Sequence, residues 1–250
     1  QLAVGDVLGL GAGTIVSVLA IVVVTFGGTV WLGRVLGVSR GLSLLVGTGF
    51  SICGASAIAA MESVVDREDE DVATAVAMVT IFGTIAMAVL PIVGSGLGFT
   101  DVEHGRLAGG AVHEVAQVVA AASPAGAGAV AVAVVVKLSR VVLLAPMVAV
   151  VSVARRFGTD GPSASRPPIM PLFVAGFLVA VVVRSTGVLP EPVLVGAEQL
   201  TTLLLAGALF ALGSAVRVRS LLRTGPRAFV LGAASTVLAT VMALLGVLLA

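Results

Sequence analysis

The chain has 250 residues, of which 58% are hydrophobic and only 11% charged, and its mean hydropathy is +1.19. A soluble globular protein carries about 25% charged residues, so this composition excludes an ordinary soluble domain and indicates helices in a lipid bilayer. The net charge of +1 gives no electrostatic footprint for nucleic acid, and the single cysteine, Cys53, excludes an internal disulfide or a cysteine-cluster metal site. We expect no cofactor.

Apolar stretches long enough to cross a bilayer recur along the whole chain. A hydrocarbon core about 30 Å thick needs roughly 20 apolar residues in helical form. The first apolar stretch begins within a few residues of Gln1, and no basic signal-peptide region precedes it. We therefore expect further helices before it in the natural protein. The predicted spans form one all-α transmembrane domain and lie at 7–33, 41–61, 72–98, 107–123, 126–154, 168–184, 192–216 and 228–250.

Arginines concentrate in three connecting loops, at 34–40, 155–167 and 217–227. Basic loops of bacterial inner-membrane proteins face the cytoplasm. The three loops share one face only if 107–123 and 126–154 both cross, so the charge bias predicts eight spans with these loops cytoplasmic.

The acidic stretch at 62–71 would then face the opposite side. We interpret its last part, EDED at 68–71, as a solvated helix start, because carboxylates are stabilised at the positive end of a helix. A vestibule that attracts cations is the alternative.

Four ionisable residues interrupt the predicted spans: His113 and Glu114 in the fourth, Lys137 and Arg140 in the fifth. A charge at mid-membrane costs roughly 2.5–3.5 kcal/mol, so each needs a partner or a purpose. Gln117 lies one helical turn after His113. A tight turn between the two spans would place Glu114 at the depth of both cations, which predicts an ion pair from Glu114 to Lys137 or Arg140.

Two interpretations of these residues remain open. One is a structural ion pair that fixes helix register, with Arg140 extended toward the membrane surface. The other is functional, because one carboxylate cannot neutralise two cations. The surplus positive charge of Lys137 and Arg140, with donors from Gln117 and His113, would suit an anionic substrate, and His113 or Glu114 would exchange protons.

The His113-Glu114 pair does not complete a zinc-protease motif, because position 117, four residues after the histidine, is glutamine. The other histidine, His104, lies near Asp101 and Glu103, where we expect it to be solvated.

The second predicted span reads GTGFSICGASAIAA at 47–60 and is broken by glycine and hydroxyl-bearing residues. Glycine costs about 1 kcal/mol per helix position relative to alanine, so this is a poor straight helix. Close helix packing is one explanation. The other is an unwound helix whose backbone amides bind a ligand. The residues that would then contact the ligand are Gly49, Ser51, Cys53, Gly54 and Ser56.

The seventh predicted span contains a similar but weaker pattern of glycines, LLLAGALFALGSAV at 203–216, with Gly207 and Gly213. The segments at 47–60 and 203–216 would cross the membrane in opposite directions, as the two halves of an inverted repeat do.

Four strings resemble the YeiH family of bacterial inner-membrane proteins, which are regarded as sulfate exporters. These are GTGFSICGASAIAA at 47–60, IFGTIAMAVLP at 81–91, GGAVHEVAQVVAAAS at 109–123 and VVVKLSRVVLLAP at 135–146. The resemblance covers essentially the whole chain, and it implies helices before the point where this chain starts. It also implies a fold of the cation–proton antiporter and bile-acid symporter type, an inverted-repeat transporter with discontinuous crossing helices at 49–56 and 207–214.

The leading functional hypothesis is a secondary transporter of a small anion, with sulfate or sulfonate export implied by the resemblance and a proton as the coupling ion. An ion channel is the alternative. An intramembrane enzyme with Cys53 and His113 as nucleophile and base lacks a third orienting group, so we expect no enzyme. No GxxxxGK[ST] loop supports ATP-driven transport. The sequence leaves the oligomeric state open, a homo-oligomer included.

Overall fold

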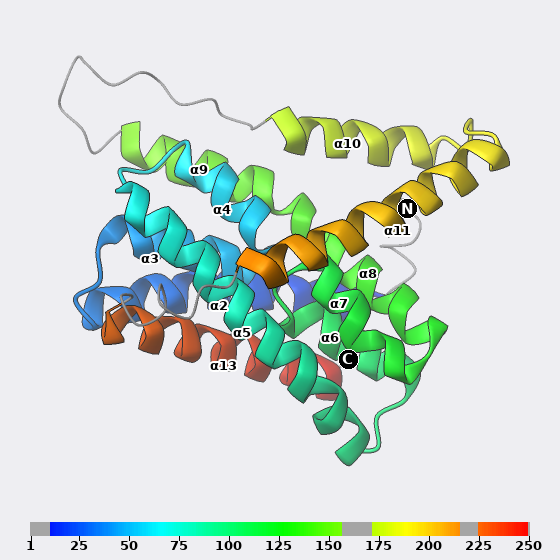
Figure 1. Ribbon diagram of the computed structural model, residues 1–250, viewed down its shortest axis with the longest axis horizontal. Helices are drawn as coiled ribbons and strands as arrows, with labels where there is room; N and C mark the ends of the chain where they lie inside the picture. Colours follow the sequence, from blue (N-terminus) through cyan, green and yellow to red (C-terminus); the bar gives the residue numbers. More distant parts are fainter. Residues whose placement is uncertain (1–10, 157–171, 216–224, 250) are drawn as a thin grey trace.

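The computed structural model describes residues 11–156, 172–215 and 225–249, and this part of the chain is helical with no strand. Four segments are long and apolar enough to cross a membrane: α2, α5, α8 with α9, and α13. The predicted class, a polytopic helical membrane protein, is confirmed (Figure 1). The helices are α2 (Ala12–Val35), α3 (Arg40–Ser51), α4 (Ala55–Glu62), α5 (Asp69–Gly96), α6 (Asp101–Ala111), α7 (Val115–Ala122), α8 (Ala127–Val142), α9 (Leu144–Arg156), α10 (Leu172–Ser185), α11 (Glu191–Ala215) and α13 (Pro226–Leu249), with a 3-10 turn at Ser123–Ala125.

Helices α3 and α4 fold back on each other and form a re-entrant pair, which we call hairpin 1 (residues 40–62). Ser39, the N-cap of α3, donates from its Oγ to the Asp71 carboxylate at 3.1 Å. A Cβ built on Gly41 would lie 2.6 Å from the Asp66 carbonyl oxygen. The start of α3 therefore lies beside the segment that follows α4, so both ends of hairpin 1 are at one end of the bundle, which we call end A.

Helices α6 and α7 form a second re-entrant pair, hairpin 2 (residues 101–122). Gly105 lies against the Ala129 carbonyl, and Gly109, four residues later on α6, lies against the Ala133 carbonyl, four residues later on α8. Helices α6 and α8 therefore run in the same direction. Because α7 connects them, it must return to the end at which α6 began.

The two hairpins enter the bundle from opposite ends. Helix α5 starts beside the base of hairpin 1 at end A and finishes before the base of hairpin 2, at the opposite end, which we call end B. Helix α13 packs antiparallel to α2: Gly33 faces Leu231, and Ser17 Oγ donates to the Gly246 carbonyl at 3.5 Å. The last residues of α2 and the first residues of α13 therefore also lie at end A.

The predicted crossings at 41–61 and 107–123 are wrong, because each range turns back within the bundle. In the described residues, four segments have the length and hydropathy of a span (α2, α5, α8 with α9, and α13), and two hairpins reach into the middle (Figure 1). Each hairpin has the hydropathy of a membrane-spanning helix and about the same total length, so composition alone does not reveal the turn.

Two re-entrant pairs in place of two crossings leave unchanged which basic loops share an end, although two of the eight predicted crossings are not found in the described residues. Residues 34–40 lie at end A, and so does Arg227, whose Nη1 lies 3.3 Å from a Cβ built on Gly37. Helix α9, which ends at Arg156, packs in the same apolar cluster as Val64. Most of the other two basic loops lies outside the described residues.

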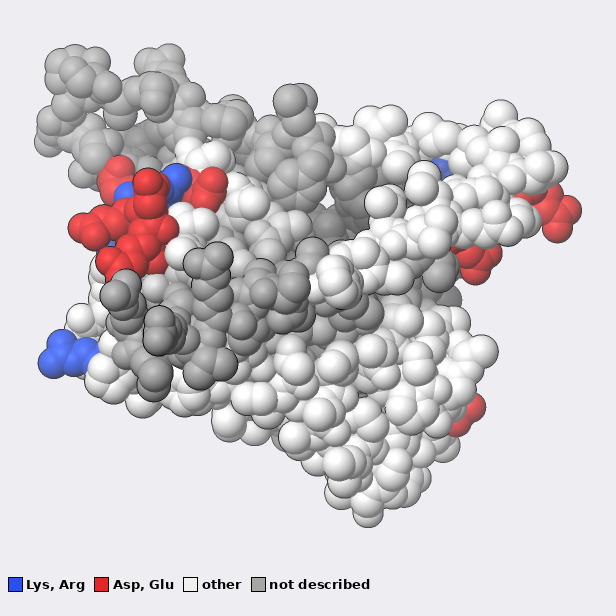
Figure 2. All heavy atoms as spheres, in the orientation of Figure 1, with Lys and Arg blue, Asp and Glu red and all other residues white. Residues whose placement is uncertain are grey.

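The acidic stretch at 62–71 lies at end A and not opposite the basic loops, which corrects its predicted side. Arg67 pairs there with Asp69, and Asp71 accepts from Ser39. Figure 2 shows these acidic side chains gathered at one end of the molecule next to Lys or Arg atoms. The stretch begins α5, as expected of carboxylates at a helix N-terminus.

The predicted crossing helix at 207–214 is also wrong. Helix α11 runs unbroken from Glu191 to Ala215. A Cβ built on Gly207 would meet nothing within 4 Å, so no close approach requires this glycine. The discontinuous partner of hairpin 1 is hairpin 2.

The hairpin topology predicts which sites are labelled from the same side of the membrane. In a Cys53→Ser background, Val35→Cys and Glu70→Cys should react with a membrane-impermeant maleimide from the same side, and Ser95→Cys from the other. Intact cells and inverted vesicles give the two sides. Labelling of residues 35 and 70 from opposite sides would mean that 41–61 crosses after all.

Candidate functional site

The tips of the two hairpins, residues 52–54 and 112–114, meet in the middle of the bundle. The Ala55 backbone N–H, at the start of α4, donates to Glu114 Oε1. Gly54 has φ 72°, which favours glycine, and a Cβ on it would overlap the Glu114 carboxylate. The predicted unwinding of the second span is therefore present, and Gly54 is what lets the carboxylate reach the backbone.

Arg140 of α8 joins both tips through the backbone. Its Nε and Nη2 donate to the Ser51 carbonyl at 2.8 and 2.6 Å, and Nη2 also donates to the Phe50 carbonyl at 2.9 Å. Its Nη1 donates to the carbonyls of Gly109 and Gly110 at 3.1 and 2.7 Å. The side chain is fully buried, and these five bonds match the five N–H donors of a guanidinium.

These carbonyls need a partner because they belong to broken helices. The last carbonyls of a helix have no intrahelical donor, and α3 and α6 both end inside the bundle. No water of the bilayer core would satisfy them. The charge of Arg140 also opposes the negative ends of both helix dipoles. Arg140 is thus committed to the protein's own backbone in this structure.

Lys137, one turn earlier on α8, is also fully buried. Its Nζ donates to the Val112 carbonyl at 2.8 Å. An ammonium group has three donors, so two remain for another acceptor. Lys137 is therefore the cation at the tips that can still bind an anion.

The predicted ion pair from Glu114 to Lys137 or Arg140 is not formed. Among the described residues, the carboxylate–cation pair within 4.0 Å is Arg67 with Asp69. Glu114 instead accepts from a backbone amide of hairpin 1, while both cations donate to backbone carbonyls. Burial of unpaired backbone groups is costly, which explains why the charges serve the helix ends first.

The electrostatic balance at the tips is positive. Helices α4 and α7 begin there and present the positive ends of their dipoles. Arg140 compensates the negative ends of α3 and α6. Lys137 and the two N-termini then face a single carboxylate, Glu114, so the arrangement suits an additional anion.

His113 is held between hairpin 1 and α13. Its ring lies 4.3 Å from the Phe50 ring, and its Nε2 is 3.1 Å from Thr236 Oγ1. The side chain is fully buried.

Gln117 ties hairpin 2 to α5. Its Nε2 donates to the Thr80 carbonyl at 3.2 Å and to Thr84 Oγ1 at 3.3 Å, while its Oε1 accepts from the Glu114 N–H at 3.3 Å. A Cβ on Gly83 would collide with this amide. Gln117, predicted as a substrate donor, thus bonds to the protein here.

The remaining predicted residues lie around the tip of hairpin 1. Cys53 Sγ is 3.1 Å from Ser56 Oγ, and Ser56 is exposed. Ser51 Oγ donates to the Thr48 carbonyl at 3.3 Å. The Gly49 carbonyl accepts from the Gly54 N–H at 2.9 Å and so closes the tip.

Residue types did not reveal the backbone acceptors at Phe50, Gly109 and Gly110 or the Thr236 partner of His113. Gly109 and Gly110 in the sequence were the feature that could have indicated this close approach of α8 to α6. A Cβ on Gly109 would lie 2.5 Å from the Ala133 carbonyl, so glycine is what brings α8 close enough for Arg140 to bind the end of α6.

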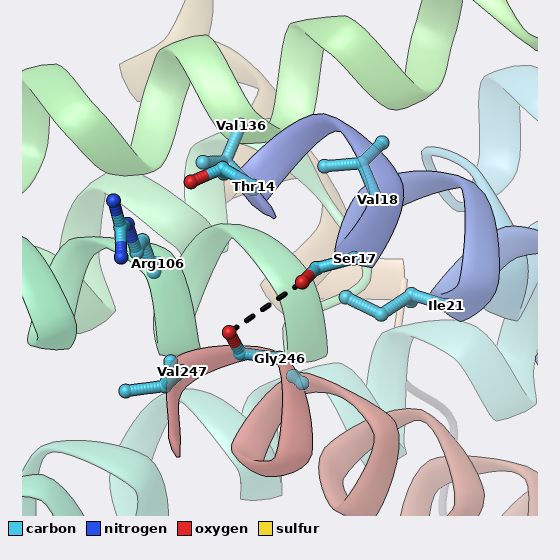
Figure 3. Close-up of a pocket in the computed structure, with 9 residues that line it drawn as sticks. Thr14, Ser17, Val18, Ile21, Arg106, Val136, Gly246 and Val247 are labelled. Carbon is cyan, nitrogen blue, oxygen red and sulfur yellow. Dashed lines mark hydrogen bonds between the residues drawn. The ribbon is translucent and has the colours of Figure 1, made fainter. Parts of the chain in front are cut away.

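A separate small cavity lies between α2, α6, α8 and α13 (Figure 3). Its volume is about 10 Å³, room for roughly one water. Thr14 and Arg106 line it, and Ser17 bonds to Gly246 beside it. None of the predicted site residues lines it. Within the described ranges, no cluster of three His, Cys, Asp or Glu could hold a metal.

The carbonyl-binding role of Arg140 predicts that its shape matters as much as its charge. Arg140→Lys keeps the charge but has three donors for four buried carbonyls, and an unpaired buried carbonyl costs about 1–3 kcal/mol. We expect a clearly lowered Tm in detergent. Arg34→Lys, exposed at the end of α2, is the matched control and should leave Tm unchanged. Equal Tm values for Arg140→Lys and the unsubstituted protein would contradict this role.

The chain matches a known family along most of its length. Residues 1–232 match the family described as "Conserved hypothetical protein 698". A UPF0324 membrane protein of Corynebacterium glutamicum is 46% identical over 250 residues, which is 100% of this chain and 72% of that protein. One from Agrobacterium fabrum is 35% identical over 211 residues, 84% of this chain and 60% of the relative.

A third relative, the UPF0324 membrane protein TauZ of Paracoccus denitrificans, is 35% identical over 251 residues, covering 98% of this chain and 74% of that protein. The chain thus spans about 60–74% of the length of these three relatives. No solved structure matches it. The chain belongs to the UPF0324 family of membrane proteins, which is the YeiH family that its motifs resemble.

Proposed function

We propose that this membrane protein is a secondary transporter of a small anion. The observation that carries the proposal is the meeting of two re-entrant hairpins, from opposite ends of the bundle, at two fully buried cations. Broken helices at mid-membrane are found where backbone is buried in protein or lines a substrate cavity. Transporters use such helix ends to bind ions and charged substrates.

The topology favours alternating access over an open channel. Each hairpin separates the tips from one end of the bundle, and the tips contact each other through Ala55 and Glu114. A small movement of either hairpin would expose Lys137 to one side only. An ion channel would instead need a path past both tips at once.

The proposed roles follow from the donors at the tips that backbone carbonyls do not occupy. The two remaining donors of Lys137 and the Ala55 N–H, which in this structure donates to Glu114, bind the anion, while Arg140 and Gln117 hold the tips in position. Proton coupling is assigned to Glu114 or His113. Ser51, Cys53 and Ser56, with Gly49 and Gly54, shape the tip of hairpin 1. Sulfate or a sulfonate, moved outward, is the cargo implied by family resemblance.

We further propose that the protein lies in the bacterial inner membrane with end A in the cytoplasm, because Arg34, Arg40 and Arg227 lie there. The role is transport and not catalysis. Cys53 Sγ hydrogen-bonds to Ser56 Oγ, and a hydroxyl is not a base that could activate the thiol.

The transporter proposal predicts saturable flux that depends on Lys137. Full-length protein in liposomes should take up labelled sulfate, sulfite or methanesulfonate with saturation. Lys137→Gln, which removes the charge at nearly constant length, should lower the flux at least tenfold while the protein stays folded by size-exclusion chromatography. Ser139→Ala on the same helix is the control. Full activity in Lys137→Gln would remove the assigned site, and unsaturable single-channel currents would favour a channel.

A further inference from the structure

We propose that Glu114 is the resident anion of the site: its carboxylate occupies the position that the transported anion takes, and the anion binds by displacing it. This inference rests on the proposed function and names its coupling step. It selects Glu114 over His113 as the group that carries the proton.

The first observation is the position of the carboxylate. Glu114 comes from hairpin 2, yet its Oε1 accepts from Ala55 at the first turn of α4 in hairpin 1. That turn has N–H groups without intrahelical acceptors and the positive end of the dipole, the usual place for a bound anion. The missing side chain of Gly54 leaves the space in which the carboxylate lies.

The second observation is independent of α4. Lys137 is a fully buried cation beside the tips, and it bonds to one neutral carbonyl. No carboxylate of the described residues lies within 4.0 Å of it. A buried charge without a close partner is costly, so an anion bound directly beside Lys137 would be stabilised there. Glu114 acts on Lys137 only from beyond 4.0 Å, and its carboxylate is held at the α4 end by Ala55.

His113 is less suited to the exchange. It is fully buried, its ring packs on Phe50, and Nε2 is engaged by Thr236. The charged group that acts on Glu114 is Lys137 from α8, and Glu114 itself acts on the thiol of Cys53 in hairpin 1. Among residues 52–54 and 112–114, which form the two tips, Glu114 is the single carboxylate.

Displacement of Glu114 couples the anion to a proton. A carboxylate moved away from the Ala55 amide into an apolar surrounding takes up one H⁺ on its oxygen, because an unpaired charge there is costly. The charge of the substrate then replaces the charge of Glu114. A monoanion would move with one proton and no net charge, and a dianion would carry one net negative charge. The direction of transport follows from the combined gradients of anion and proton.

The first test is the pH dependence of sulfate binding to purified full-length protein, measured with labelled sulfate. Binding to the unsubstituted protein should tighten by up to tenfold for each pH unit as pH falls through the titration of Glu114, since one proton is taken up per anion. Glu114→Gln, which cannot compete as an anion, should bind at least as tightly with no pH dependence. Glu62→Gln, at the other end of α4, should keep the unsubstituted profile. The same pH slope in Glu114→Gln would overturn the inference.

A second test does not depend on the cargo. Glu114→Ala empties the carboxylate position, so formate should enter it and raise the Tm of this variant, with little effect on the unsubstituted protein. Chloride at equal ionic strength is the control. Equal formate shifts in both proteins, or none in Glu114→Ala, would refute the assigned position. If the unsubstituted protein binds neither sulfate, sulfite nor methanesulfonate, the proposed function fails, and the formate result still decides the place of the carboxylate.

Discussion

The structure depends on how buried backbone carbonyls at two broken helices are satisfied. Helices α3 and α6 stop in the middle of the bundle, where neither water nor a further helical turn can serve their last carbonyls. Arg140 provides one group with enough donors, in a fixed planar geometry, to serve both ends at once. Its charge is tolerated at this depth because it faces two negative dipole ends. Arg140 thereby joins the ends of both hairpins in the middle of the bundle.

The same arrangement determines which kind of solute the tips can bind. With the negative helix ends compensated by Arg140, the positive features that remain are the N-termini of α4 and α7 and the ammonium of Lys137. All three attract anions. Glu114 is the carboxylate of the protein itself that lies at these positive groups and accepts from the Ala55 N–H. The choice of an anion thus comes from the remaining balance of charge, and not from a count of cationic residues.

Much of the site could be predicted from the sequence, and the topology only in part. Buried charges are rare enough in apolar spans that Glu114, Lys137 and Arg140 stood out, and glycines marked the break at 52–54 correctly. The predicted ion pair from Glu114 to Lys137 or Arg140 was wrong because a guanidinium can bind carbonyls as well as carboxylates. Every residue has a backbone carbonyl, so the sequence does not show which ones a guanidinium will bind. The re-entrant turns were missed because each hairpin matches a spanning helix in length and hydropathy, and two such errors leave the arginine parity unchanged. Glycines at 207–213 misled because small residues are frequent in continuous membrane helices too.

A cryo-electron microscopy map of the full-length protein in lipid nanodiscs, recorded with sulfate present, would test the two hairpins and the anion site together. We expect two hairpins that enter from opposite sides, with Arg140 density between the carbonyls of Ser51 and Gly110 and anion density between Lys137 and Ala55. A continuous helix that carries 41–61 across the membrane, with residues 62–71 on the far side from residue 35, would contradict this arrangement.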